Sequence, residues 1–229
     1  YCRRPGRQTG EDGPELKPEA EENRRSQSSR RKGAGMEYTD HKSRCAWANP
    51  KNELYIKYHD EEWGQPVHDD QRLFEMLILE SFQAGLSWEC VLNKREAFRK
   101  AFDGFDLEKV CAYDEARMEE LKQDAGIVRN SRKIKAAVEN ARIFREIVKE
   151  YGSFAEYLWG FTQGKVVYEN DKASSPLSDA ISKDLKKRGM TFVGTTIIYA
   201  YLQAVGVICS HENGCYLYRQ ETDVMTDSY

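Results

Sequence analysis

Apolar residues recur at helical spacing through most of the chain, and this pattern sets the fold class. In DDQRLFEMLILESFQAG (residues 69–85), large apolar residues return every three or four positions, which is the period of one helix face. Asp69 and Asp70 are candidate N-caps, and Gly85 is a candidate stop. The best strand candidate, GKVVYEN at 164–170, is short. The sequence therefore predicts an all-α protein with roughly eight to ten helices.

Several later segments share this helical pattern. They are NKREAFRKAFDGF (93–105), DEARMEELKQDAG (114–126), SRKIKAAVENARIFREIVKEYG (131–152), SFAEYLWGF (153–161) and SPLSDAISKDLKKRG (175–189). Ser175 or Ser178 is the expected cap of the last one. Residues 194–208, GTTIIYAYLQAVGVI, are apolar nearly all round, so we expect them to form the central buried helix.

Composition divides the chain into three parts. Residues 1–43 are rich in Gly, Pro, Ser and mixed charge and nearly lack large apolar residues, so we expect a disordered extension. Residues 44–219 form the expected folded domain, and 220–229 a C-terminal tail. The chain has 229 residues, of which 40% are hydrophobic, enough for a substantial core.

The same composition bears on location. No apolar run approaches the roughly 18–20 residues of a membrane span, and the N-terminal region lacks the apolar stretch of a secretory signal. The six cysteines lack the compact spacing of a disulfide framework. We therefore expect a cytoplasmic protein without membrane contact.

Charge limits the ways in which this chain can bind nucleic acid. The first 44 residues carry 11 Lys/Arg and 8 Asp/Glu, and the remainder carries 24 basic and 30 acidic residues. Nucleic-acid-binding domains are usually basic overall. If the folded part binds DNA, it must therefore do so through a local basic patch.

Two Cys/His pairs stand near opposite ends of the expected domain. Cys45 and His59 make the first pair, and His211 and Cys215 the second. Two thiolates and two imidazoles suit a tetrahedral zinc ion, and four protein ligands would leave it no open position for catalysis. The spacing alone leaves an alternative open, in which His59 is a satisfied core histidine and Cys215 a buried thiol.

A basic hairpin is expected between two of the helical segments. Residues 121–141 predict two helices joined by a short turn at Gly126, and the polar residues after the turn are Arg129, Asn130, Arg132 and Lys133. A tight turn at a helix N-terminus lets backbone N–H groups approach a phosphate. An ordinary helix-loop-helix with a solvated basic end is the alternative.

A carboxylate interrupts an apolar helix face near several aromatic residues. Glu80 falls at the register of core-facing residues, where a carboxylate needs a partner or a function. The aromatic residues nearby in sequence are Tyr55, Tyr58, Trp63 and Trp88. Together they suggest a pocket for a flat ligand that forms hydrogen bonds. The alternative is an aromatic core with Glu80 at the solvated edge of a helix.

Long motifs in a fixed order resemble the bacterial 3-methyladenine DNA glycosylases of type I. They are RCAW, LYIKYHDEEWG, LFEMLILESFQAGLSW, VLNKREAFRKAF, QDAGIVRNSRKI, LKKRGMTFVGTT and HENGC. The resemblance extends from about Arg44 to Arg219 and implies a multi-helix, helix-hairpin-helix DNA glycosylase fold. The implied reaction is hydrolysis of the N-glycosidic bond of 3-methyladenine flipped out of double-stranded DNA, without lyase activity.

The resemblance also assigns roles to the residues above. It implies one structural zinc ion, held by the two Cys/His pairs, which ties the N- and C-terminal segments together. It further implies a DNA-anchoring hairpin around Gly126, a base pocket made by the four aromatic residues, and Glu80 as the principal recognition and catalytic residue. A monomer suffices for this task. Two alternatives remain: a catalytically idle DNA-damage binder, and a glycosylase for a wider range of alkylated purines.

Overall fold

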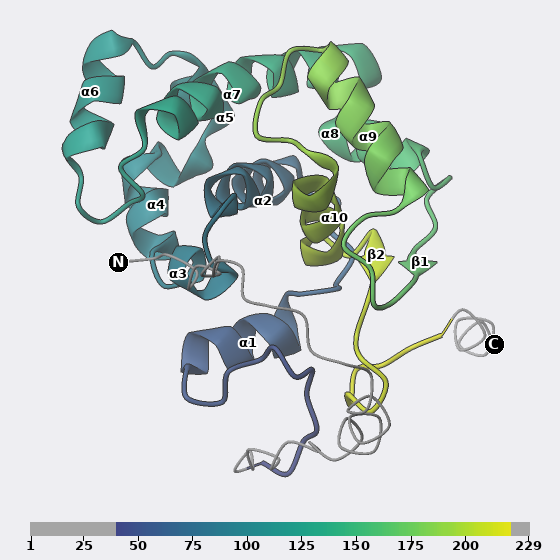
Figure 1. Cartoon of the computed structure of the whole chain (residues 1–229). Coiled ribbons are helices and arrows are strands. Elements are labelled where there is room, and N and C mark those ends of the chain that lie inside the picture. Colours follow the sequence, from purple (N-terminus) through teal and green to yellow (C-terminus); the bar gives the residue numbers. More distant parts are fainter. Residues whose placement is uncertain (1–39, 221–229) are drawn as a thin grey trace, which may run out of the picture.

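The computed structural model describes residues 40–220, whose regular secondary structure is almost entirely helical (Figure 1). Within this range lie ten α-helices, one short 3₁₀ helix and two strands of two residues each, so the all-α prediction is confirmed. Most of the expected extension 1–43, and all of the expected tail 220–229 except its first residue, fall outside the described residues.

The elements follow one another with short connections. In chain order they are α1 (Glu53–Glu61), α2 (Asp70–Gln83), α3 (Trp88–Leu92), α4 (Arg95–Ala101), the 3₁₀ helix η1 (Asp103–Phe105), α5 (Leu107–Cys111), α6 (Glu115–Gln123), α7 (Ser131–Tyr151), α8 (Phe154–Gly160), β1 (Val167–Tyr168), α9 (Pro176–Lys187), α10 (Thr195–Ala204) and β2 (Ile208–Cys209).

Local capping explains where the predicted helices begin. The side chain of Asp69 accepts a hydrogen bond from the backbone N–H of Arg72 at 2.9 Å and starts α2. After α2, Gly85 has a positive φ of 78°, which residues with a side chain rarely adopt. At α9, Ser175 is the N-cap, and its partner Ser178 completes a capping box.

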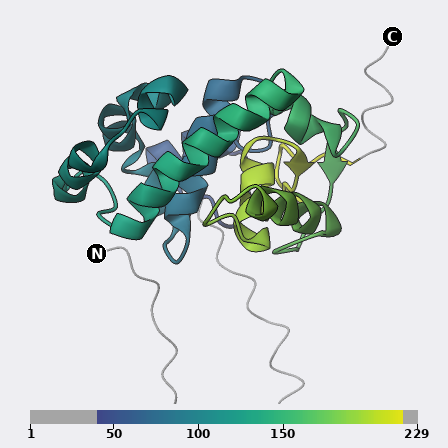
Figure 2. The same ribbon diagram turned by 90° about the horizontal axis from the view of Figure 1, so that it is seen from above.

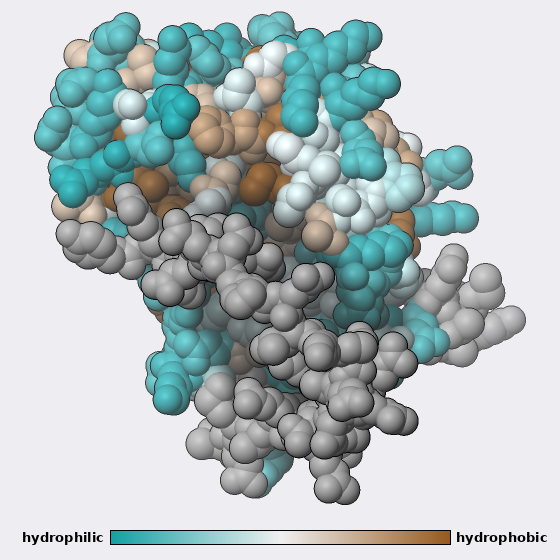
Figure 3. Space-filling view, viewed as in Figure 1, coloured by the Kyte–Doolittle hydropathy of each residue, from teal (hydrophilic) through white to brown (hydrophobic). Residues whose placement is uncertain are grey.

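Helices α2 and α10 form the centre of the fold. α10 packs against both α2 and α9, and the long helix α7 crosses over α2, as the view from above shows (Figure 2). Leu77 of α2 and Tyr201 and Leu202 of α10 are completely buried, which confirms the expectation of a central apolar helix. Hydrophilic residues cover most of the rim in Figure 3, including α6.

Two contacts join segments that lie far apart in the sequence. The strand expected in 164–170 forms as β1, and it pairs in parallel with β2, with Val167 opposite Ile208. Closer to the termini, the backbone N–H of Tyr216 donates to the carbonyl of Ser43 at 2.8 Å. The fold therefore closes its chain ends upon each other, beside the two Cys/His pairs.

Candidate functional site

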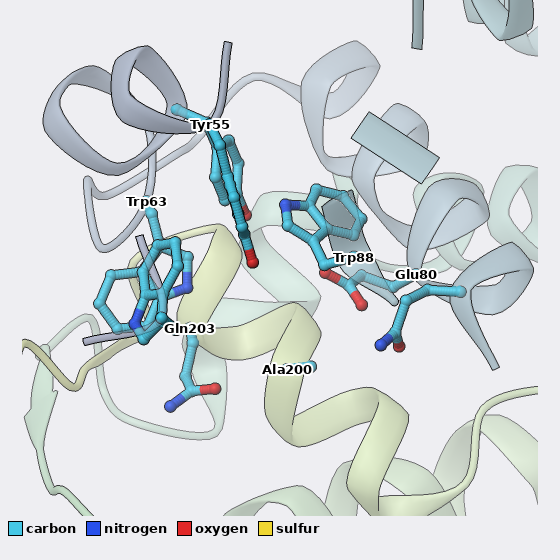
Figure 4. Close-up of a pocket in the computed structure, with 9 residues that line it drawn as sticks. Tyr55, Trp63, Glu80, Trp88, Ala200 and Gln203 are labelled. Atoms are coloured by element: carbon cyan, nitrogen blue, oxygen red, sulfur yellow. The ribbon is translucent and has the colours of Figure 1, made fainter. Parts of the chain in front are cut away.

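Side chains from four helical regions converge on one pocket (Figure 4). The region of α1 contributes aromatic residues, α2 contributes Glu80, α3 begins with Trp88, and α10 forms the opposite wall. The lining residues are Trp47, Tyr55, Tyr58, Trp63, Glu80, Gln83, Trp88, Ala200 and Gln203. All five pocket residues expected from the sequence are thus brought together.

Glu80 is the only acidic residue among those that line the pocket, and its side chain is almost fully buried. It is 3% exposed, so it does not lie at the solvated edge of a helix. Among residues 40–220, no hydrogen-bond donor or cation pairs with its carboxyl group, and burial alone raises its pKa to about 8. A buried carboxyl group without a partner is costly, so it indicates a group that meets its partner in a ligand.

The aromatic side chains of the pocket contact one another in tilted and edge-on geometry. The ring centroids of Tyr58 and Trp88 are 5.2 Å apart at an interplanar angle of 45°. On the α1 side, Trp47 contacts Tyr55 at 5.2 Å and Trp63 at 4.9 Å. The pocket therefore offers ring faces and edges to a flat ligand.

The indole N–H of Trp88 is a second polar group without a partner. Its Nε1 atom is buried and has no hydrogen-bond acceptor among the described residues. A buried donor that lacks an acceptor costs about 1–3 kcal/mol. One unpaired acceptor on Glu80 and one unpaired donor on Trp88 thus belong to the same pocket.

The sequence did not point to four of the lining residues. Gln83 follows Glu80 by three positions and so lies on the same helix face, which means that the spacing could have indicated Gln83 as a pocket residue. Gln203 is the one amide in the apolar run of α10, and Ala200 lies one turn before it. Trp47 stands in the motif RCAW, but no local pattern directs its ring toward the pocket.

Buried ion pairs hold the end of α1 against the rest of the fold. The guanidinium of Arg95, at the start of α4, donates to Glu75 on α2 at 2.6 Å and to Glu62 after α1 at 2.7 Å. Arg95 and Glu75 are both buried. At the other end of α1, Glu89 of α3 accepts hydrogen bonds from two asparagines, one of them the N-cap Asn52. The pocket aromatics on α1 are therefore fixed relative to α2 and α3.

The two Cys/His pairs meet in one buried cluster behind this aromatic wall. The donor atoms of Cys45, His59, His211 and Cys215 all lie within 4.8 Å of one another. The Sγ atom of Cys215 is 3.5 Å from Nε2 of His59 and 3.6 Å from Nδ1 of His211. Sulfur and nitrogen ligands of a tetrahedral ion with ordinary bond lengths are about 3.6 Å apart. The cluster therefore has both the donor set and the spacing for a bound metal ion.

A second layer of hydrogen bonds orients these ligands. Asp60 accepts from Nδ1 of His59 at 2.8 Å, which leaves Nε2 without a proton, so that its lone pair can coordinate a metal. Arg44 donates to both oxygens of Asp60, at 2.7 and 2.6 Å. The backbone N–H of Glu212 donates to the Sγ of Cys45 at 3.3 Å, an arrangement that favours a thiolate. These bonds would also satisfy a core histidine, so the support for a metal site comes from the convergence of the four donor atoms.

The expected hairpin joins α6 to α7. The backbone N–H of Gly126 donates to Asp124 at 2.7 Å, and Asn130 is the N-cap of α7. Arg129 and Arg132 are exposed, and among residues 40–220 neither guanidinium forms an ion pair or a hydrogen bond. The hairpin thus presents two unpaired cations beside the N-terminus of a long helix.

Lys133 has a different position from the one expected. Its side chain is buried, and its ammonium donates to the backbone carbonyls of Phe82 and Ala84 at 2.6 Å each. It is therefore not available to a phosphate, and we withdraw it from the residues expected to contact DNA. Its charge supports the end of α2 instead.

Comparison with known proteins gives a consistent picture. A family model described as methyladenine glycosylase matches residues 47–219. The chain is 46% identical over 182 residues to DNA-3-methyladenine glycosylase 1 of Escherichia coli (strain K12), which covers 76% of this chain and 96% of that protein. It is 40% identical over 179 residues to DNA-3-methyladenine glycosylase of Haemophilus influenzae, with the same coverage of 76% and 96%.

Solved structures agree with the sequence relatives. The structure of 3-methyladenine DNA glycosylase I from Staphylococcus aureus, described as the basis of 3-methyladenine recognition, has a TM-score of 0.74 at 34% identity and covers 78% of this chain and 97% of that one. A glycosylase of the same name in complex with 3-methyladenine has a TM-score of 0.74 at 33% identity, with 77% and 98% covered. None of the helices in residues 40–220 is long and apolar enough to cross a membrane.

Proposed function

Because the chain belongs to the methyladenine glycosylase family, we propose that it excises 3-methyladenine from double-stranded DNA by hydrolysis of the N-glycosidic bond. The products are free base and an abasic site. The observation that carries the proposal is Glu80, a buried carboxyl group without a partner in an aromatic pocket. A catalytically idle DNA binder has no use for such a costly group.

The chemistry of the substrate matches this pocket. A purine methylated at N3 carries a positive charge while it is still attached to its sugar. The carboxylate of Glu80 accepts from the exocyclic amine and attracts that charge, and the rings of Tyr58 and Trp88 contact its face. The indole N–H of Trp88 finds an acceptor among the ring nitrogens of the base. A neutral adenine lacks the charge and is bound less well.

The reaction then needs little acid catalysis. As the C1′–N9 bond breaks, its electron pair moves to the base, which leaves as neutral 3-methyladenine while positive charge develops on the sugar. Water adds to C1′ and loses a proton to solvent. The part played by Glu80 is to hold the cationic base outside the DNA stack, the state from which the bond breaks. Within residues 40–220 no lysine lines the pocket, so we propose a monofunctional glycosylase without lyase activity.

We propose that the hairpin grips the DNA backbone. Arg129 and Arg132 supply exposed cations beside the N-terminus of α7, where the positive end of the helix dipole favours a phosphate. Asn130 shapes this end of the helix, because its side chain accepts from the N–H groups of the first turn. One chain contains both pocket and hairpin, so the proposed enzyme acts as a monomer.

The buried cluster is proposed to bind one zinc ion. Two thiolates and two imidazoles at tetrahedral spacing are a donor set that zinc favours. When bound, the ion supplies a structural link rather than a reactive water, because four protein ligands fill its coordination sphere. Cys45 and Cys215 then join the two ends of the fold beside His59, which belongs to the same helix as Tyr55 and Tyr58.

Base release from alkylated DNA tests the proposal. Wild-type protein should liberate 3-methyladenine, measured by chromatography, and Glu80→Ala should reduce the single-turnover rate at least about 100-fold because it removes the hydrogen-bonding carboxylate. Glu61→Gln, on an exposed side chain of α1, is the matched control and should retain full activity. Release of base by Glu80→Ala at the wild-type rate would remove Glu80 from the mechanism. Absence of release by the wild type would favour the idle binder.

A further inference from the structure

Lys133 makes an unusual set of contacts for a buried lysine. Its residue is 7% exposed, and its ammonium lies 2.6 Å from the carbonyl oxygens of both Phe82 and Ala84. Among residues 40–220, no carboxylate pairs with it. Burial lowers the pKa of Lys133, because the two carbonyl contacts compensate only part of the hydration free energy that the ammonium loses. A cation is retained at this position although burial disfavours it.

The two carbonyls belong to the C-terminal end of α2. The last carbonyls of a helix have no intrahelical donors, and the backbone dipoles give this end a partial negative charge. α2 has no basic residue in its last turn, and its C-cap, Ala84, makes no capping hydrogen bond through its backbone N–H. Lys133, from a helix about 50 positions later in the chain, supplies both the donors and the opposite charge.

This end of α2 carries the base pocket. Glu80 lies one helical turn before Ala84, Gln83 is the last residue of the helix, and Trp88 begins α3 four residues after Ala84. The turn between α2 and α3 is short, so a shift of the Ala84 carbonyl moves Gln83 and Trp88 with it. The ammonium therefore acts on the backbone that joins three pocket residues.

Lys133 also belongs to the hairpin end of α7. It is the third residue of that helix, and its backbone N–H donates to the N-cap Asn130 at 3.2 Å. A second lysine makes the reciprocal contact: Lys94, just before α4, donates to the carbonyls of Ala125 and Gly126 in the hairpin at 3.2 and 3.0 Å. Lys133 thus fastens the hairpin end of α7 to the end of α2, and Lys94 fastens the hairpin to the segment between α3 and α4.

We propose that Lys133 is a positioning residue, which holds the α2–α3 turn in the geometry that binds the base and ties that turn to the hairpin. The inference rests on the proposed function, since it concerns the same pocket. It predicts that Lys133 contributes to recognition of the base and not to contact with phosphate.

Two binding measurements separate these roles. The probes are free 3-methyladenine, followed by tryptophan fluorescence, and undamaged duplex DNA, followed by anisotropy at several salt concentrations. For Lys133→Met we expect roughly 10- to 100-fold weaker binding of the free base and a similar loss in single-turnover excision, because small misplacements of binding groups have effects of this size. Affinity for undamaged DNA and its salt dependence should equal those of the wild type.

Lys135→Met is the matched control, because Lys135 lies on the same helix with its side chain 69% exposed. It should bind the free base like the wild type. Lys133→Gln, whose amide keeps two N–H donors without a charge, gives the same test if Lys133→Met does not fold. The affinity of Lys133→Gln for the free base should be lower than that of the wild type. If Lys133→Met also folds, its affinity should be lower still.

The opposite results would overturn the proposal. Weaker binding of undamaged DNA with a salt slope smaller by about one, together with unchanged binding of the free base, would make Lys133 a phosphate contact. Variants that fold and retain both affinities would reduce Lys133 to a purely structural role. Failure of the wild type to release 3-methyladenine would refute the proposed function and this inference together, whereas an active wild type with unaffected variants refutes the inference alone.

Discussion

Replacing Glu80 by glutamine should make the protein more stable, and increasingly so as the pH rises. The pKa of Glu80 is raised by burial from its ordinary value of 4.5 to about 8. Between these two values the folded protein holds a proton that the unfolded chain has released. The free energy of unfolding of the wild type therefore falls as the pH rises through this window. Glutamine does not titrate, so the free energy of unfolding of the variant does not fall with pH for this reason.

The size of the effect follows from the same two values. Each pKa unit corresponds to about 1.4 kcal/mol, and most of the interval between the two pKa values lies between pH 5 and pH 8. The difference in unfolding free energy between Glu80→Gln and wild type should thus grow by about 3 kcal/mol over that range. It should level off above about pH 8, where the carboxyl of Glu80 is ionised in both states.

Urea denaturation at pH 5, 6, 7, 8 and 9 measures this difference, and subtraction of the two proteins cancels the titration of other groups. Glu61→Gln, at an exposed position, should show no such growth and serves as the control. A difference that stays constant from pH 5 to pH 9, or that favours the wild type at pH 8, would refute the view that Glu80 is an unpaired buried carboxyl. Glu80→Gln is expected to be more stable but to release less base, because the buried carboxyl group that destabilises the fold is the group that binds the ligand.

Three further predictions concern the metal cluster, the pocket and the hairpin. Cys215→Ser should bind less than one zinc ion per protein by atomic emission and unfold at a lower temperature, whereas Cys111→Ser, also buried but outside the cluster, should keep its zinc. Trp88→Phe keeps an aromatic ring but loses the indole donor, so its affinity for free 3-methyladenine should fall by about 1 kcal/mol by calorimetry; an unchanged affinity would mean that the donor is not used. Arg132→Ala should weaken binding to all DNA sequences alike and reduce the salt slope by about one; a sequence-dependent loss would contradict a phosphate contact.

The sequence was most informative where a local rule decides the structure. Caps such as Asp69 and Ser175, and a positive φ at Gly85, depend on neighbouring residues only, and these predictions are confirmed. The short strand within 164–170 was also recognisable, but its partner Ile208–Cys209 was not, because strand pairing joins residues about forty positions apart.

The pocket shows what a periodic pattern contains and what it leaves out. The register of Glu80 on an apolar helix face was enough to single it out. Its lack of a partner was not readable, because partners come from segments distant in sequence. Trp47 reaches the pocket only because the segment before α1 folds back beside Trp63, a contact between rings 4.9 Å apart.

Lys133 marks the limit most clearly. By sequence it is one of several basic residues after a turn, and Arg132 beside it fits that description. Successive positions on a helix point about 100° apart, so Arg132 faces solvent and Lys133 faces the end of α2.

By itself, the sequence determined seven of the ten helices described in residues 40–220, the caps of α2 and α9, and which residue types are present for metal and base. The tertiary structure alone decided which charges are buried without partners and which are free. The physical reason is that the cost of a charge depends on the atoms around it, and those atoms come from every part of the chain.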